Sequence, residues 1–167
     1  ESGMSVSVAA VRRNASSPLS RIKSLSYLDN LLMRAAAAEA GTEEALTLDF
    51  QGHVVEGSAS NIFLVKHGGV LTPPVTAGVL PGITRDCVLE LCPKLCIEAV
   101  ETMFSPEELA RADEAFLTNS LMEVMPLTEV EEAPIGGGRP GPLTKRLASA
   151  YCALVARETG SQLGTRS

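Results

Sequence analysis

Apolar and polar residues alternate along residues 44–74, and this alternation predicts two pairs of β-strands. In the first strand, Leu46, Leu48 and Phe50 are expected on one face. Short turns close each pair, and Pro73 with Pro74 stops the last strand. The predicted strands are residues 45–50, 53–55, 61–65 and 70–72.

Helical spacing begins after Lys23. Ser26 followed by Asp29 is a capping-box pattern, which places the helix start near Tyr27, and Gly41 is a natural stop. Lys23 is therefore expected in the connection before the helix rather than on a solvated face. Apolar side chains continue through this helix at helical spacing: Leu28, Leu31, Leu32, Ala35 and Ala36.

Three further helices are predicted. One follows residues 80–84 (LPGIT), carries Ile83, Cys87 and Leu91 on one face and ends at Pro93. A short helix is capped by Ser105. The last helix covers residues 144–158, with a buried stripe of Leu147, Tyr151, Leu154 and Val155.

The remaining strands are expected over residues 4–12, 96–100, 115–118 and 122–127. The tally of about nine strands and four helices does not alternate strictly. It indicates an α+β fold rather than a doubly wound sheet.

Composition narrows the class of protein. A chain of 167 residues with 45% hydrophobic residues predicts one soluble domain. The net charge of -6 argues against a nucleic-acid partner, and no apolar run is long enough to span a membrane. The four cysteines fit no zinc spacing, so we expect no metal site, and free, mostly buried thiols favour a cytoplasmic location.

Three features could carry chemistry or could be ordinary structure. Each of the four lysines can be a surface charge, and Glu56 can be a solvated acid at a strand end. The Gly82-Ile83-Thr84 helix start leaves backbone N–H groups that could bind phosphate, or it is simply a capped helix. It is not a P-loop, because the Gly-Lys-Ser/Thr part is missing.

Four segments at compatible spacing resemble the class IV aminotransferases, the pyridoxal 5'-phosphate (PLP) enzymes of fold type IV. This group includes branched-chain and D-amino acid aminotransferases and aminodeoxychorismate lyase. The segments are residues 44–74, 23–28 (KSLSYL), 80–86 (LPGITRD) and 112–120 (ADEAFLTNS).

The resemblance implies a role for individual residues. Lys23 would be catalytic and would hold PLP through a Schiff base, and Glu56 would pair with the pyridine nitrogen. Asn119 and Leu121 would lie where the family binds the substrate carboxylate. The other expected cofactor contacts are Tyr27 at the phenolic oxygen, Leu80 on the ring, and Ile83, Thr84 and Ser120 around the phosphate.

The resemblance also implies a domain organisation. Residues 1–159 match the larger C-terminal pseudo-barrel domain, mixed strands flanked by helices, and residues 160–167 are expected to be a disordered tail. The smaller N-terminal domain, with a phosphate-binding arginine, has no counterpart, and the chain begins Glu1-Ser2-Gly3-Met4. We therefore expect a fragment that folds but catalyses poorly, from a native homodimer.

Three functions stay open at this point. The leading one is an amino acid transaminase acting on amino acid and 2-oxo acid substrates, favoured by residues 56–63 (EGSASNIF) and 141–144 (GPLT). An aminodeoxychorismate lyase, releasing pyruvate and 4-aminobenzoate, is favoured by residues 118–122 (TNSLM) with Met125-Pro126. A non-catalytic remnant of the fold is the third.

Overall fold

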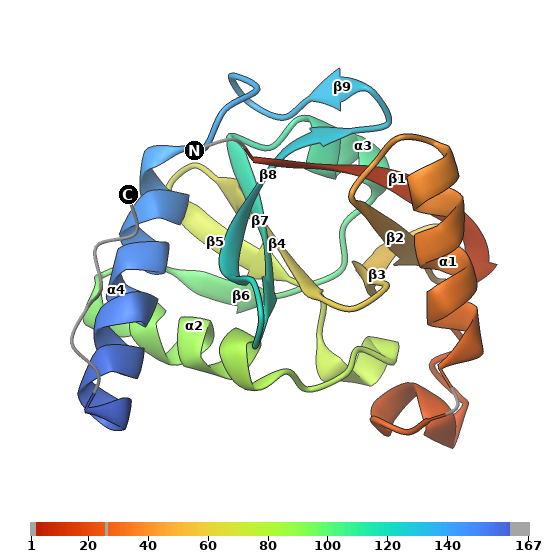
Figure 1. The fold of residues 1–167 in the computed structure, drawn as a ribbon. Coiled ribbons are helices and arrows are strands. Elements are labelled where there is room, and N and C mark those ends of the chain that lie inside the picture. The colour runs from red at the N-terminus through yellow and green to blue at the C-terminus, as the bar shows by residue number, and fades with distance from the viewer. Residues whose placement is uncertain (1–2, 26, 161–167) are drawn as a thin grey trace.

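A computed structural model describes residues 3–25 and 27–160 as a curved, mixed sheet with helices packed against both of its faces (Figure 1). This confirms the α+β class. The strand order is β3-β2-β1-β8-β7-β4-β5-β6, and β9 pairs with β8. The strands are β1 (Met4–Arg12), β2 (Glu44–Leu48), β3 (Val54–Gly57), β4 (Asn61–Lys66), β5 (Gly69–Thr72), β6 (Ala99–Glu101), β7 (Glu114–Asn119), β8 (Glu123–Val130) and β9 (Ala133–Pro134).

The described residues form four α-helices and two short 3-10 helices. They are η1 (Pro18–Arg21), α1 (Leu28–Glu39), η2 (Val75–Ala77), α2 (Ile83–Lys94), α3 (Pro106–Ala110) and α4 (Pro142–Thr159). None of the helices within these residues is long and apolar enough to cross a membrane. Of the expected tail over residues 160–167, all but Gly160 lies outside the described residues, and so does the Ser26 cap.

The two predicted strand pairs are confirmed. β2 pairs antiparallel with β3, and β4 pairs antiparallel with β5. β1 lies parallel to both β2 and β8, so the first strand of the chain joins its last strands to the Glu56-bearing pair. The antiparallel pairs β4–β7 and β7–β8 complete the middle of the sheet.

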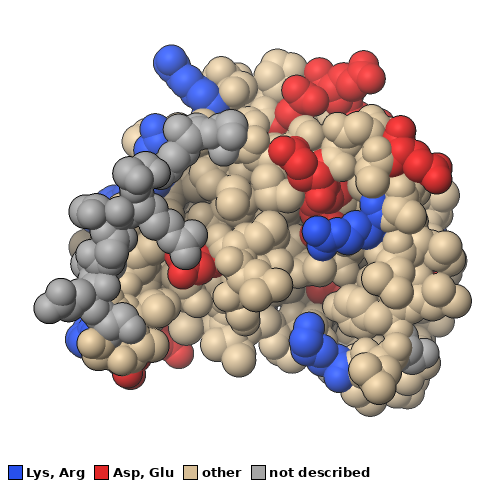
Figure 2. All heavy atoms as spheres, viewed as in Figure 1, with Lys and Arg blue, Asp and Glu red and all other residues tan. Residues whose placement is uncertain are grey.

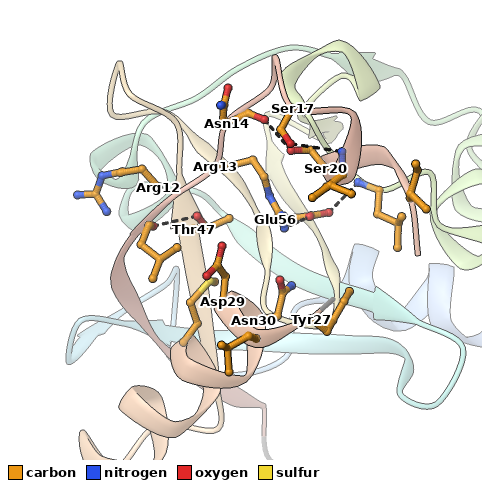
Figure 3. Close-up of a pocket in the computed structure, with 16 residues that line it drawn as sticks. Arg12, Arg13, Asn14, Ser17, Ser20, Tyr27, Asp29, Asn30, Thr47 and Glu56 are labelled. Atoms are coloured by element: carbon orange, nitrogen blue, oxygen red, sulfur yellow. Dashed lines mark hydrogen bonds and ion pairs between the residues drawn. The ribbon is translucent and has the colours of Figure 1, made fainter. Parts of the chain in front are cut away.

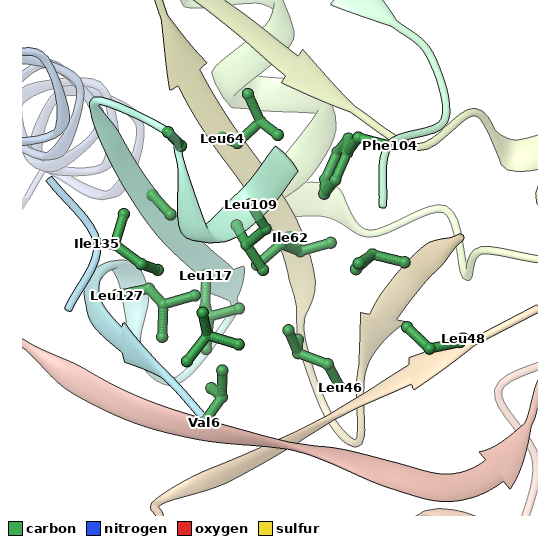
Figure 4. Close-up of a cluster of buried hydrophobic side chains, with 14 residues drawn as sticks. Val6, Leu46, Leu48, Ile62, Leu64, Phe104, Leu109, Leu117, Leu127 and Ile135 are labelled. Atoms are coloured by element: carbon green, nitrogen blue, oxygen red, sulfur yellow. The ribbon is translucent and has the colours of Figure 1, made fainter. Parts of the chain in front are cut away.

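Alternation along each strand divides the core between two faces of the sheet. Ile62 and Leu64 point into the cluster on the inner face (Figure 4). Phe63 points to the opposite face, where its ring stacks on Phe116 at a centroid distance of 4.8 Å beneath α2 and α4. The period of two thus explains why nearly every residue of β4 is buried.

The helical spacing of α1 is confirmed, but its leucines do not face the sheet. Leu28, Leu31 and Leu32 are exposed, and the buried face is Asn30, Met33 and Ala37. Small side chains, Ala9 and Ala45, receive this face on the strands below. The sheet therefore accepts the narrow side of the helix and leaves the bulky side open.

On the predicted face of α2, Leu91 is buried but 76% of Ile83 is exposed. Arg85 is buried in its place because its guanidinium pairs with Glu101 and donates to the Pro73 carbonyl at 3.0 Å. Pro93 does not end the helix but lies in its last turn.

Phe50 is also exposed, because β2 ends at Leu48. The side chain of Asp49 then closes the turn by accepting from the backbone N–H of Gln51 and His53. At the other edge, the strand expected from Cys96 begins only at Ala99. Cys96 has a φ of 56°, which no extended strand allows.

Further differences concern cysteines and charge. Cys87, Cys92 and Cys96 are free thiols, Cys152 Sγ donates to Glu123 Oε2 at 3.4 Å, and only Cys92 is fully buried. Leu154 and Val155 are only partly buried, and they pack against the cluster of Phe63 and Phe116 beneath α2 and α4. On the face shown in Figure 2, most of the described acidic side chains lie toward the upper right, a few lie at the lower left, and the basic ones are scattered.

Candidate functional site

The carboxylate of Glu56 is the buried charge around which the candidate site is built. It lies on β3 and only 4% of the residue is exposed. One carboxylate oxygen pairs with the guanidinium of Arg13, which follows the end of β1. The other accepts the backbone N–H of Leu80 at 2.9 Å. The parallel start of the sheet thus brings the charge of Arg13 to Glu56 from 43 positions earlier in the chain.

Leu80 connects this carboxylate to the start of α2. Its carbonyl accepts from Asn61 Nδ2 at 2.9 Å, so the connection is held on both sides by strand side chains. At Gly82, the helix cap, a Cβ atom would clash with Asn61 Oδ1. Glycine is therefore required where the helix start approaches β4, and it brings no side chain to cap the first N–H groups.

The first residues of α2 differ in their surroundings. Ile83 points outward, whereas Thr84 is buried. The Thr84 hydroxyl lies 3.3 Å from the hydroxyl of Tyr151 on α4. Tyr151 therefore fixes the direction of the Thr84 side chain.

Burial sets the proton affinities at this site. Burial raises the pKa of the Glu56 carboxyl to about 7, although the Arg13 charge and the Leu80 N–H favour the ionised form. Burial also raises the pKa of the Tyr27 hydroxyl, and the negative charge of Glu56 raises it further by a smaller amount. The positive charge of Arg13 lowers it in part. Tyr27 and Glu56 are thus electrostatic neighbours.

Tyr27, Glu56 and Leu80, three of the expected cofactor contacts, line one cavity of about 260 Å³. Figure 3 shows Arg13 and Glu56 meeting across it, with Tyr27 and Asn30 of the α1 segment alongside. Among the described residues its lining does not include Lys23, Ile83, Thr84 or Ser120. The structure therefore brings part of the expected set into one cavity and leaves the rest around it.

Lys23 lies in the connection before α1, as predicted, but its side chain is exposed. Its Nζ atom lies 5.6 Å from the centroid of the Tyr27 ring. This distance brings the ammonium group within cation–π range of a residue that lines the cavity. The expectation that Lys23 avoids a solvated position is wrong for this chain, because neither η1 nor α1 covers it.

The turn between β7 and β8 carries the expected substrate contacts. Asn119 Oδ1 accepts from the backbone N–H of Leu121 at 2.9 Å and of Met122 at 2.7 Å. Asn119 Nδ2 donates to the Ala59 carbonyl at 2.9 Å, which joins this turn to the β3–β4 connection. Ser120 and Leu121 are exposed, so both project from the turn into solvent.

Sequence reasoning missed Arg13, Asn61 and Tyr151. Arg13 follows a predicted strand, which suggests only a surface cation, since its acidic partner is remote in sequence. The pattern marks Asn61 only as the start of a strand, and Tyr151 only as part of an apolar stripe. The tertiary arrangement alone shows that these polar atoms face the site.

Comparison with known proteins identifies relatives of this chain. The family model described as "Amino-transferase class IV" matches residues 2–130. The branched-chain-amino-acid aminotransferase of Escherichia coli (strain K12) is 41% identical over 138 residues, 83% of this chain and 45% of that protein. The enzyme of the same name from Pseudomonas aeruginosa is 41% identical over 149 residues, 89% of this chain and 48% of that protein.

Solved structures give the same picture. The crystal structure of E. coli branched-chain amino acid aminotransferase has a TM-score of 0.88 at 36% identity, covering 99% of this chain and 55% of that one. The Thermobaculum terrenum enzyme, solved in its PLP form, has a TM-score of 0.87 at 33% identity, covering 97% and 52%. The chain thus spans about half the length of the relatives it matches. It belongs to the class IV aminotransferase family.

Proposed function

We propose that the complete protein carrying this chain is a PLP-dependent aminotransferase that acts on branched-chain amino acids with a 2-oxo acid as acceptor. The observation that carries the proposal is the buried Glu56 carboxylate, held by Arg13 and by the Leu80 N–H next to the start of α2. The similarity to branched-chain aminotransferases supports the substrate class.

The residues present fit PLP. Glu56 offers a buried anion for a protonated ring nitrogen, and the uncapped first turn of α2 offers N–H groups to a phosphate. Because Gly82 has no side chain, it lets the start of α2 lie close to Asn61 and leaves the first N–H groups uncovered by a side chain at that position. When bound, PLP supplies the electron sink that makes the substrate Cα proton acidic.

Each expected site residue has a task in this proposal. Lys23 would hold the cofactor covalently, and its amine would take the proton from the substrate Cα and return it. Glu56 would stabilise a positive charge on the ring nitrogen, and Tyr27 would donate to the phenolic oxygen. Leu80 would pack on the ring, Ile83, Thr84 and Ser120 would hold the phosphate, and Asn119 and Leu121 would meet the substrate carboxylate.

The attachment point is tested on the complete protein with PLP. After borohydride reduction and digestion, the pyridoxyl mass is expected on the peptide that contains Lys23. The three other lysines, Lys66, Lys94 and Lys145, are internal controls. A label on any of them in place of Lys23 contradicts the assignment.

The reaction is tested by mixing the complete protein with PLP, leucine, isoleucine or valine, and 2-oxoglutarate. Glutamate is expected in each mixture, and none is expected without 2-oxoglutarate. Absence of glutamate with all three donors contradicts the proposal.

Lyase chemistry is the second candidate, and the turn at residues 118–122 favours it. Asn119 is larger than the residue usual in branched-chain aminotransferases, and it fills the turn by binding the N–H of Leu121 and Met122. Both reactions begin with removal of the Cα proton, so Lys23 and Glu56 do not separate them. Pyruvate and 4-aminobenzoate formed from aminodeoxychorismate, with no glutamate formed in the assay with 2-oxoglutarate, would establish the lyase.

A further inference from the structure

Glu44 is a second buried carboxylate, at the start of β2, and only 2% of the residue is exposed. Its Oε1 atom accepts from the N–H of Ala45 at 2.9 Å, from the N–H of Ser58 at 3.2 Å and from the Ser58 hydroxyl. Its Oε2 atom accepts from the N–H of Ala59 at 3.3 Å and from the Ser60 hydroxyl at 3.1 Å. Four of these five donors belong to residues 58–60, which connect β3 to β4.

This connection is tight. The N–H of Gly57 donates to the Ser60 carbonyl at 2.7 Å, and the Ser58 N–H also donates to the Ala45 carbonyl at 2.9 Å. A Cβ atom at Gly57 would clash with the Ser60 hydroxyl and lie 3.2 Å from Glu44 Oε2. The carboxylate therefore fills the inside of the turn, where it replaces the water that a polar turn otherwise binds.

Three parts of the candidate site meet at this connection. Glu56 precedes it by two residues, and Asn30 of α1 donates to the Ser58 carbonyl at 2.6 Å. Asn119 Nδ2 donates to the Ala59 carbonyl, while Asn119 Oδ1 holds the N–H groups of Leu121 and Met122. The position of the Ala59 carbonyl thus sets where the β7–β8 turn stands relative to Glu56.

We infer that Glu44 is a positioning residue that fixes the β3–β4 connection and, through Asn119, the turn over residues 119–122. This inference rests on the proposed function for its catalytic consequence but not for its structural one. Glu44 touches neither the cofactor nor the substrate. It acts by supplying acceptors to the four donors of residues 58–60, which a neutral side chain of the same shape does not do.

The test replaces Glu44 by glutamine, since the amide keeps the shape and turns one acceptor into a donor that faces other donors. The matched control is Glu43→Gln. Glu43 is the exposed neighbour, and its carboxylate accepts from the N–H of Ser5 at 2.6 Å and from its hydroxyl at 2.8 Å. If Glu44→Gln does not fold, Glu44→Asp, which keeps the charge but shortens the side chain, replaces it.

Hydrogen exchange on the cofactor-free complete protein is the first readout. Exchange over residues 57–61 and at the N–H groups of Leu121 and Met122 is expected to rise about tenfold in Glu44→Gln. Glu43→Gln should leave both unchanged. Faster exchange over residues 57–61 alone overturns the inference, because Glu44 then stabilises only its own connection.

Kinetics of the complete protein are the second readout. KM for the amino donor is expected to rise about tenfold in Glu44→Gln, with kcat within about threefold of the parent, because Glu56 keeps its contacts to Arg13 and Leu80. A fall in kcat of about tenfold with an unchanged KM overturns the inference. If the parent protein itself does not transaminate, the proposed function fails, and the exchange result still decides the role of Glu44.

Discussion

The sheet side of the candidate site and the segment that carries Lys23 are built in opposite ways. On the sheet side, Glu56 is buried and both of its carboxylate oxygens have partners. On the other side, Lys23 is exposed and is flanked by exposed leucines, among them Leu25 and Leu28. One half of the site is thus fixed within the chain, and the other is an open apolar surface.

The contrast follows from the contacts that each half of the site makes with the sheet. Glu56 lies among strands whose hydrogen bonds hold its neighbours in register, from β2 on one side to the Leu80 connection on the other. Helix α1 contacts the sheet through Met33 and Ala37, which pack on Ala9 and Ala45. Preorganised charge is therefore supplied by the sheet, whereas cover over the lysine is not supplied by the described residues.

The largest expected effect is on activity and comes from the open side. Lys23→Arg in the complete protein should lower transamination about 10³-fold or more, because guanidinium neither forms the Schiff base nor accepts the Cα proton. Its thermal midpoint should stay that of the parent, since the side chain is exposed. Lys66→Arg, the same change at another exposed lysine, is the control. An active Lys23→Arg protein contradicts the assignment.

On the sheet side the largest expected effect is on stability. Arg13→Met leaves the buried Glu56 without its cation and should lower the free energy of unfolding by about 3 kcal/mol at pH 8. Arg12→Met is the control, since Arg12 is exposed and its guanidinium binds the Ala9 and Ala10 carbonyls. Urea denaturation measures both. Combining Arg13→Met with Glu56→Gln should cost less than the sum of the two, and strict additivity contradicts the coupling.

Strand β1 and helix α1 show which features of the fold can be predicted from the sequence alone. Strand alternation is a local property, and β1 was predicted with its observed bounds, Met4–Arg12. The exposed side of α1 was not predictable, because what decides it is the small size of Ala9 and Ala45 on strands that the helix reaches only after folding. Helical spacing tells which residues share a face, not which face the sheet accepts.

The same limit applies to the candidate site. Glu56, Leu80 and Tyr27 were predicted from segments that resemble a family, and they do line one cavity. Arg13 and Glu44 were not predicted, because their partners are 43 and about 14 to 16 positions away. No local pattern records such pairings.

A smaller effect depends on pH. The pKa of Glu56 is about 7 in the folded chain and about 4.5 in the unfolded chain. The folded chain keeps a proton that the unfolded chain releases between these values, so stability falls as pH rises from 4.5 through 7. Glu56→Gln removes this loss.

The stability of Glu56→Gln relative to the parent should therefore improve by a few kcal/mol, roughly 3, between pH 4.5 and pH 8. Urea denaturation of the cofactor-free chain at several pH values measures it. Glu98→Gln, at an exposed acid, is the control. A relative stability that does not change with pH contradicts the raised pKa. In the complete protein, the same Glu56→Gln change should lower activity roughly 10²-fold.

The smallest expected effect on stability belongs to the exposed leucines. Replacing Leu25 and Leu28 together by serine should change the free energy of unfolding by no more than about 0.5 kcal/mol, because neither side chain packs against the core. Leu46→Ala, in the inner cluster, should cost about 2 to 5 kcal/mol and calibrates the measurement.

The same leucines should instead govern association. An open apolar surface favours contact with a second surface, so the 167-residue chain is expected to self-associate as its concentration rises. The doubly serine-substituted chain should sediment as a monomer at concentrations where the parent does not, while Leu46→Ala leaves the association of the folded fraction unchanged. Identical sedimentation of the parent and the serine variant would show that the exposed leucines around Lys23 do not drive association. The contrast between the two halves of the site would then fail.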